Sequence, residues 1–223
     1  MLKETNKLDE NVLTEKLLSV KSIHIMGAGL NTERTAHTAV GEVSERGWRV
    51  IPVHPRDAGA SISGIPIRGS IEKGTDLELV VLFLAPKRAQ EVVKSLMINN
   101  TEKKPLIWFQ PGAESQIATN WLVDACWPFV ENDCIVRFIK RNEIKITQKK
   151  LPWFRQVLDD DNSGCSIWSY HKPGEESDLP ISKVEWVGDL LDLTKSSHII
   201  PKYVRRLVKE NESLEECGYR LSL

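Results

Sequence analysis

One stretch near the N-terminus, residues 22–32, restricts the possible folds most strongly. Its apolar run from Ser22 to Met26 stops at two glycines, Gly27 and Gly29, and small polar residues follow. Glycine has no Cβ atom, so the backbone can turn sharply there and its N–H groups can approach a pyrophosphate closely. Residues 35–46 then show the apolar spacing of a helix, whose N-terminus would add partial positive charge. The stretch predicts a strand, a phosphate-binding loop and a helix; the alternative is an ordinary glycine turn between a strand and a helix.

This loop departs from the dinucleotide-binding fingerprint at two points. Thr32 stands where the fingerprint has its third glycine. No acidic residue stands at the end of the second predicted strand, Trp48–Val53, to hold a ribose hydroxyl. That strand ends instead in His54, Pro55 and Arg56, which favours a phosphate over a bare ribose at this position.

Strand-like and helix-like segments alternate over the first 141 residues. The central one, Leu79–Leu84, is a continuous apolar run, which is typical of a strand buried on both faces. Between Asp57 and Ser70 we expect a loop that crosses the mouth of the sheet. Further strands are expected at 106–109 and 127–130, and helices at 11–20, 88–98 and 114–125. The pattern predicts an α/β fold with a doubly wound, Rossmann-like parallel sheet, in which ligands bind at the carboxyl ends of the strands.

From residue 142 onward the pattern changes, and we expect a small C-terminal extension of uncertain α+β structure. The predicted domains are therefore 1–141, with an N-terminal helix within 1–20, and an extension of unknown function at 142–223. Within the extension the expected elements are one or two helical turns at 151–158, a turn at 159–164, a strand at 165–170, a helix or strand at 184–193, an amphipathic helix at 201–209 and a possible strand at 214–223.

Composition narrows the possible partners and location. The formal net charge is −1 with mixed signs throughout, so we expect no nucleic-acid partner. No apolar run approaches the roughly 20 residues of a membrane span, and the charged first 15 residues do not resemble a signal peptide. We therefore expect a cytoplasmic protein that does not bind membranes. The four cysteines form no C-x-x-C pair, so we expect reduced, mostly buried thiols and no metal site.

Several blocks between about residues 20 and 140 occur in a characteristic order. They are Ile25–Gly29 followed by Asn31, Arg34 and His37; Val50–Pro55; Gly64–Pro66 with Ser70; Ile107–Ala113; and Asp133-Cys134. Together they resemble the CoA-binding domain family, namely the stand-alone relatives of the N-terminal domain of the succinyl-CoA synthetase alpha subunit. The resemblance implies a nucleotide-binding fold of the CoA-binding type and a small-molecule ligand, coenzyme A or an acyl-CoA.

The same resemblance implies a set of ligand contacts, all in loops that follow predicted strands. The pyrophosphate would lie at the glycine turn, the adenosine end after the second strand, and the pantetheine arm further along the sheet edge. His37 either contacts the ligand or only caps or packs its helix. The implied residues are Gly27, Ala28, Gly29, Asn31, Thr32, Arg34 and His37 near the phosphates, Val53, His54 and Arg56 at the adenosine end, Ala85, Pro86 and Lys87 beside the adenine or pantetheine, and Gln110 and Gly112 along the arm.

The resemblance does not extend to the catalytic parts of the synthetases. None of the five histidines lies in a glycine- and alanine-rich phosphohistidine loop, and we find no ATP-binding domain and no hydride-transfer pair. We expect no catalytic residues and a non-catalytic carrier, sensor or regulatory subunit. One alternative is an NADP-dependent oxidoreductase or redox sensor, in which Arg56 takes the 2′-phosphate. A second is an interaction subunit of an acyl-CoA synthetase that docks a protein partner through residues 142–223.

Overall fold

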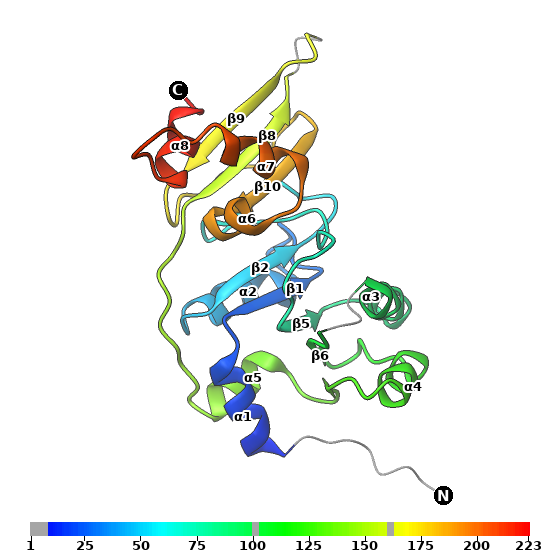
Figure 1. The fold of residues 1–223 in the computed structure, drawn as a ribbon. Coiled ribbons are helices and arrows are strands. Elements are labelled where there is room, and N and C mark those ends of the chain that lie inside the picture. Colours follow the sequence, from blue (N-terminus) through cyan, green and yellow to red (C-terminus); the bar gives the residue numbers. More distant parts are fainter. Residues whose placement is uncertain (1–8, 100–102, 160–162) are drawn as a thin grey trace, which may run out of the picture. The chain divides into compact units, whose positions relative to one another are not determined.

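The structure is a computed structural model and describes residues 9–99, 103–159 and 163–223 (Figure 1). The chain forms two compact units, each made of separate segments. The first unit contains residues 1–28, 33–50 and 76–148, and the second contains residues 29–32, 51–75 and 149–223. The segment 51–75 therefore packs with the C-terminal extension. The domain limits expected from the sequence, 1–141 and 142–223, stay a prediction.

A five-stranded sheet confirms the predicted doubly wound architecture. Its order is β2-β1-β5-β6-β7. The central strands pair in parallel, with Met26 opposite Leu82 and Leu82 opposite Phe109, so their carboxyl ends lie at one edge. The strands are β1 (Ser22–Met26), β2 (Arg49–Val53), β5 (Leu79–Leu82), β6 (Leu106–Phe109) and β7 (Phe129–Val130).

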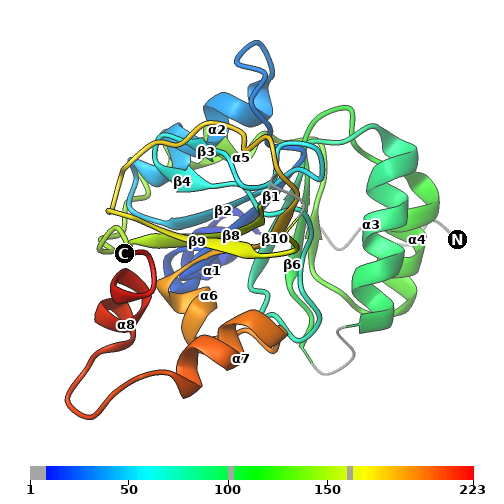
Figure 2. The same cartoon turned by 90° about the horizontal axis from the view of Figure 1, so that it is seen from above.

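Helices of the first unit cover this sheet. The side chain of Asp9 caps the first helix by accepting a hydrogen bond from Asn11 N, and Ser115 caps the fourth through Ala118 N. Two of the helices, α3 and α4, lie side by side (Figure 2). The helices are α1 (Glu10–Ser19), α2 (Thr35–Ser44), α3 (Pro86–Asn99), α4 (Gln116–Asp124) and α5 (Ile135–Arg141), the last of which the sequence did not predict.

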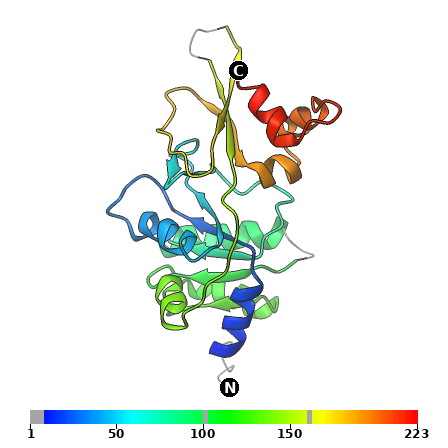
Figure 3. The same ribbon diagram turned by 90° about the vertical axis from the view of Figure 1, so that its left-hand side faces the viewer.

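The second unit is built on a three-stranded antiparallel sheet in the order β10-β8-β9. Helices α6, α7 and α8 gather on one side of it (Figure 3, orange to red). Its core contains Phe154, Trp186, Leu193, Val204 and Cys217. The elements are β3 (Ser61–Ile62), β4 (Ile65–Pro66), β8 (Trp153–Leu158), β9 (Ser166–His171), β10 (Val184–Asp189), α6 (Leu190–Lys195), α7 (Ile199–Arg206) and α8 (Leu214–Arg220).

Two expectations for the extension are wrong. Where helical turns were expected at 151–158, residues 153–158 form a strand, because β8 pairs with β9 along its whole length and with β10 on its other side. Residues 214–223 contain a helix rather than a strand, and a capping box between Ser213 and Glu216 starts it. The segment 184–193, left open between helix and strand, contains both, because β10 ends at Asp189 and that side chain caps α6.

Two further local expectations change, and a third falls partly outside the described residues. The loop expected at 57–70 contains the small hairpin of β3 and β4. The turn expected at 159–164 includes residues 160–162, which lie outside the described residues. All four cysteines are free, but only Cys217 is buried. The expectation of mostly buried thiols is therefore wrong, because Cys126 occupies an exposed turn directly after α4, with φ 54°, and Cys165 is exposed just before β9.

Candidate functional site

In the first unit, the glycine turn after β1 packs closely against the loop after β5. Gly27 has φ +89°, and a Cβ atom there would lie 2.5 Å from the carbonyl oxygen of Phe83. Phe83 N in turn donates a hydrogen bond to Met26 O over 3.1 Å. Both the backbone conformation and the close approach require glycine at this position. The turn therefore brings its backbone to the carboxyl edge of the sheet, as the sequence predicts.

Two helices start at the same edge. The N-cap residue of α2 is Arg34, whose side chain has only donors and therefore cannot accept hydrogen bonds from the first-turn N–H groups. The side chain of Arg34 is exposed, and that of His37, in the first turn, is half-buried. Helix α3 begins at Pro86, directly after the exposed Ala85. The partial positive charge at a helix N-terminus favours an anionic ligand.

Gln110 follows β6 at this edge and is 5% exposed. Its backbone N–H donates to Leu82 O over 3.2 Å and its carbonyl accepts from Ala113 N over 2.8 Å, so two backbone hydrogen bonds hold the residue at the end of β6. Within the described part of the chain, its side-chain Nε2 has no hydrogen-bond partner. Buried amides are almost always paired. The unpaired nitrogen therefore fits a site that a polar ligand completes. Gly112, close by, has φ +91° and is exposed.

In the second unit, the residues after Gly29 meet the residues after β2. Asp57 Oδ2 accepts a hydrogen bond from Leu30 N over 2.8 Å and lies 3.0 Å from His54 Nδ1. A Cβ atom at Gly29 would collide with the same carboxylate oxygen. The Leu30 amide, expected at the pyrophosphate, is thus engaged by a carboxylate. Val53 is buried, His54 is half-buried, and Arg56 is exposed.

Asp57 is a residue of this region that the sequence analysis missed. We expected no acidic group at the end of the second strand, and Asp57 lies beyond the His54-Pro55-Arg56 segment. A turn, in which Asp57 N donates to His54 O over 3.3 Å, returns the carboxylate to the glycine loop. The signal was the aspartate itself, within one tight turn of the strand end, where proline favours turning.

The C-terminal extension holds the segment that carries these residues. Arg68 backbone groups bond to Pro52 O and His54 N, each over 2.9 Å, and its guanidinium is buried. That guanidinium donates to Asp189 Oδ2 over 3.0 Å and to Asp192 Oδ2 over 3.1 Å. Because a buried charge requires such partners, the backbone at His54 depends on residues more than a hundred positions later in the chain.

Comparison with known proteins agrees with this fold. A family model described as "CoA binding domain" matches residues 21–139, which is more than half of the chain. The chain belongs to the CoA-binding domain family. A Thermus thermophilus structure, named cell-free ID.343, is 25% identical, with a TM-score of 0.54 and coverage of 60% of this chain and 98% of that one. A hypothetical protein from Pyrococcus horikoshii OT3 is 26% identical, with a TM-score of 0.53 and coverage of 63% and 98%. The curated proteins gave no match.

All the predicted contacts fall within the CoA-binding domain match, and the structure divides them between the two units. Residues 149–223 lie outside the match. Gly27, Ala28, Arg34, His37, Ala85, Pro86, Lys87, Gln110 and Gly112 belong to the first unit, and Gly29, Asn31, Thr32, Val53, His54 and Arg56 belong to the second.

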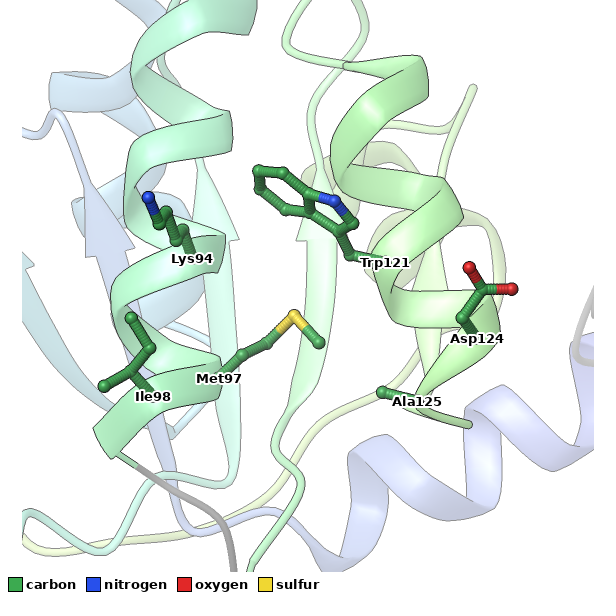
Figure 4. Close-up of a pocket in the computed structure, with 6 residues that line it drawn as sticks. All are labelled: Lys94, Met97, Ile98, Trp121, Asp124 and Ala125. Atoms are coloured by element: carbon green, nitrogen blue, oxygen red, sulfur yellow. The ribbon is translucent and has the colours of Figure 1, made fainter.

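A pocket of about 460 Å³ lies elsewhere in the CoA-binding domain, between α3 and α4 (Figure 4). Met97 from α3 and Trp121 from α4 extend into the space between the helices. The remaining lining residues are Lys94, Ile98, Asp124 and Ala125. They belong to the later turns of α3 and α4 or follow them, so none of the predicted ligand contacts lies here.

The residues that the structure describes contain neither a cluster of metal-ligating side chains nor a membrane-spanning helix. No group of three or more His, Cys, Asp and Glu side chains in them could hold a metal ion. No helix among them has the length and apolar character needed to cross a membrane.

Proposed function

We propose that this protein binds coenzyme A or an acyl-CoA. The observation that carries the proposal is the match of the CoA-binding domain family over residues 21–139. Two structural features support it in the first unit, namely the constrained turn at Gly27 and the buried, unpaired amide of Gln110.

The chemistry of these groups suits the parts of coenzyme A. The start of α2 suits pyrophosphate oxygens, because the positive end of the helix dipole lies there and the N-cap residue Arg34 makes no side-chain cap hydrogen bond. Gln110 Nε2 can donate to a pantetheine carbonyl oxygen or a phosphate oxygen. In the second unit, the exposed guanidinium of Arg56 suits the ribose phosphate of the adenosine end.

The role that we propose is non-catalytic, as a carrier, sensor or regulatory subunit. Transfer of phosphate by the related synthetases uses a histidine in a glycine- and alanine-rich loop. The five histidines here lie in Ile-His-Ile, Ala-His-Thr, Val-His-Pro, Tyr-His-Lys and Ser-His-Ile, and none has that setting.

Calorimetry on the full chain tests the proposal. We expect the wild-type protein to bind CoA or acetyl-CoA. The variant Gln110→Ala should bind about two- to tenfold more weakly, because one hydrogen bond contributes roughly 0.5–1.5 kcal/mol to the binding free energy. Gln116→Ala, which changes an exposed glutamine at the start of α4, is the matched control and should leave the affinity unchanged. Absence of CoA binding to the wild-type protein would refute the proposed function.

A further inference from the structure

Asp57 has one fixed and one open carboxylate oxygen. Oδ2 accepts the hydrogen bond from Leu30 N and lies beside His54 Nδ1, at 2.8 and 3.0 Å. Among the described residues, Oδ1 accepts no hydrogen bond. The side chain is 20% exposed, so it remains reachable from solvent. All of these groups belong to the second unit.

Doubly wound folds bind a ribose through an acidic residue in a comparable place. In such folds an acidic residue near the end of the second strand, beside the first glycine turn, accepts a hydrogen bond from the ribose 2′-hydroxyl. Asp57 lies beyond the usual sequence distance, but the turn at His54 returns it to the glycine loop. The absence of a side chain at Gly29 lets the carboxylate approach that loop closely.

We propose that Asp57 Oδ1 accepts a hydrogen bond from the ribose 2′-hydroxyl of the bound adenosine ligand. The inference rests on the proposed function and specifies which ribose oxygen of the ligand can carry a phosphate. A phosphate on the 2′-oxygen would remove the donor and place negative charge beside the carboxylate, which is unfavourable. A phosphate on the 3′-oxygen, as in coenzyme A, leaves the 2′-hydroxyl free to donate.

The same geometry decides between two ligand classes considered for this fold. NADP carries its extra phosphate on the 2′-oxygen, and a site that accepts it pairs that phosphate with arginine rather than aspartate. Arg56 is exposed next to Asp57, but Asp57 is the side chain bonded to the glycine loop. The site therefore favours 3′-phosphorylated or unphosphorylated adenosine ligands over 2′-phosphorylated ones.

The test compares coenzyme A with iso-coenzyme A, in which the ribose phosphate is on the 2′-oxygen. The two ligands have the same atoms and the same charge, so affinity differences report the position of the phosphate. We expect the full-length protein to bind coenzyme A at least about tenfold more tightly, because like charges repel when they lie close together.

The variant Asp57→Asn keeps an oxygen that can accept from Leu30 N but loses the charge. We expect it to reduce the preference to about threefold or less. Glu176→Gln, which neutralises an exposed carboxylate in the same unit, should keep the wild-type preference. Thermal unfolding of each variant checks whether it is folded. If Asp57→Asn does not fold, the relative affinities of the wild-type protein for coenzyme A and iso-coenzyme A still test the inference.

The outcomes separate this inference from the proposed function. If the wild-type protein binds both isomers equally, or if folded Asp57→Asn keeps the full preference, the role of Asp57 is refuted while CoA binding stands. If the wild-type protein binds neither isomer, the proposed function is refuted, and the inference fails with it.

Discussion

Removal of the buried guanidinium of Arg68 should destabilise the second unit strongly. Arg68 is 7% exposed and donates to Asp189 and Asp192 as well as to Pro66 O. The variant Arg68→Met fills much of the same volume but removes the guanidinium that donates to the buried carboxylate of Asp189. Breaking one partner of a buried ion pair costs about 3–5 kcal/mol.

The loss can be measured by urea unfolding followed through tryptophan fluorescence, since Trp186 lies in the core of the same unit. With a slope of about 2 kcal/mol per molar urea, a loss of about 3 kcal/mol lowers the midpoint by about 1.5 M. Arg206→Met, at an exposed position of α7, is the matched control and should change stability by less than about 0.5 kcal/mol. Equal midpoints for the two variants would refute the structural role assigned to Arg68.

Three further predictions concern other residues. Arg34→Ala and Arg56→Ala should each weaken CoA binding about tenfold, as the loss of a charge-assisted hydrogen bond; two unchanged affinities in calorimetry would show that the assigned pocket is wrong. Gly27→Ala should destabilise the protein by about 2 kcal/mol more than Gly112→Ala, because both have positive φ but only Gly27 also meets a neighbouring backbone; equal melting temperatures would contradict this. Burial, with help from the Arg155 guanidinium, lowers the pKa of His171, so its contribution to stability is complete above pH 6.5 and is lost as the pH falls below that value; a His171→Gln variant should lose less stability than the wild type between pH 7 and 5, and parallel pH profiles would argue against it.

The sheet of the first unit could be predicted from the sequence because its strands carry their own signal. Leu79–Leu82 is buried on both faces and therefore apolar throughout, and Gly27 marks the end of β1. The extension gave weaker signals. In β8 two adjacent aromatic residues precede the polar Arg155 and Gln156. Phe154 lies in the hydrophobic core, whereas Trp153 Nε1 donates to Glu175 O in a loop, so apolar and polar residues do not alternate regularly. Local periodicity alone does not separate such a strand from a helical turn.

The candidate site was predictable only in part, for a similar reason. Gly27 and Gln110 lie where strands end, so the spacing of elements places them correctly at the sheet edge. Asp57 depends on a turn that returns it to Leu30, and Arg68 depends on partners in the C-terminal extension. Contacts between residues distant in sequence are set by tertiary packing, which no local pattern records.

The bond between Arg68 and Asp189 also bears on the synthesis of the protein. The two residues are 121 positions apart in the chain. At about 5–20 residues per second, the ribosome adds the second residue roughly 6–24 seconds after the first. During that interval the Arg68 guanidinium has no carboxylate from the extension and stays hydrated. The segment around His54 can therefore reach its final conformation only after the extension has been made, so this part of the molecule matures last.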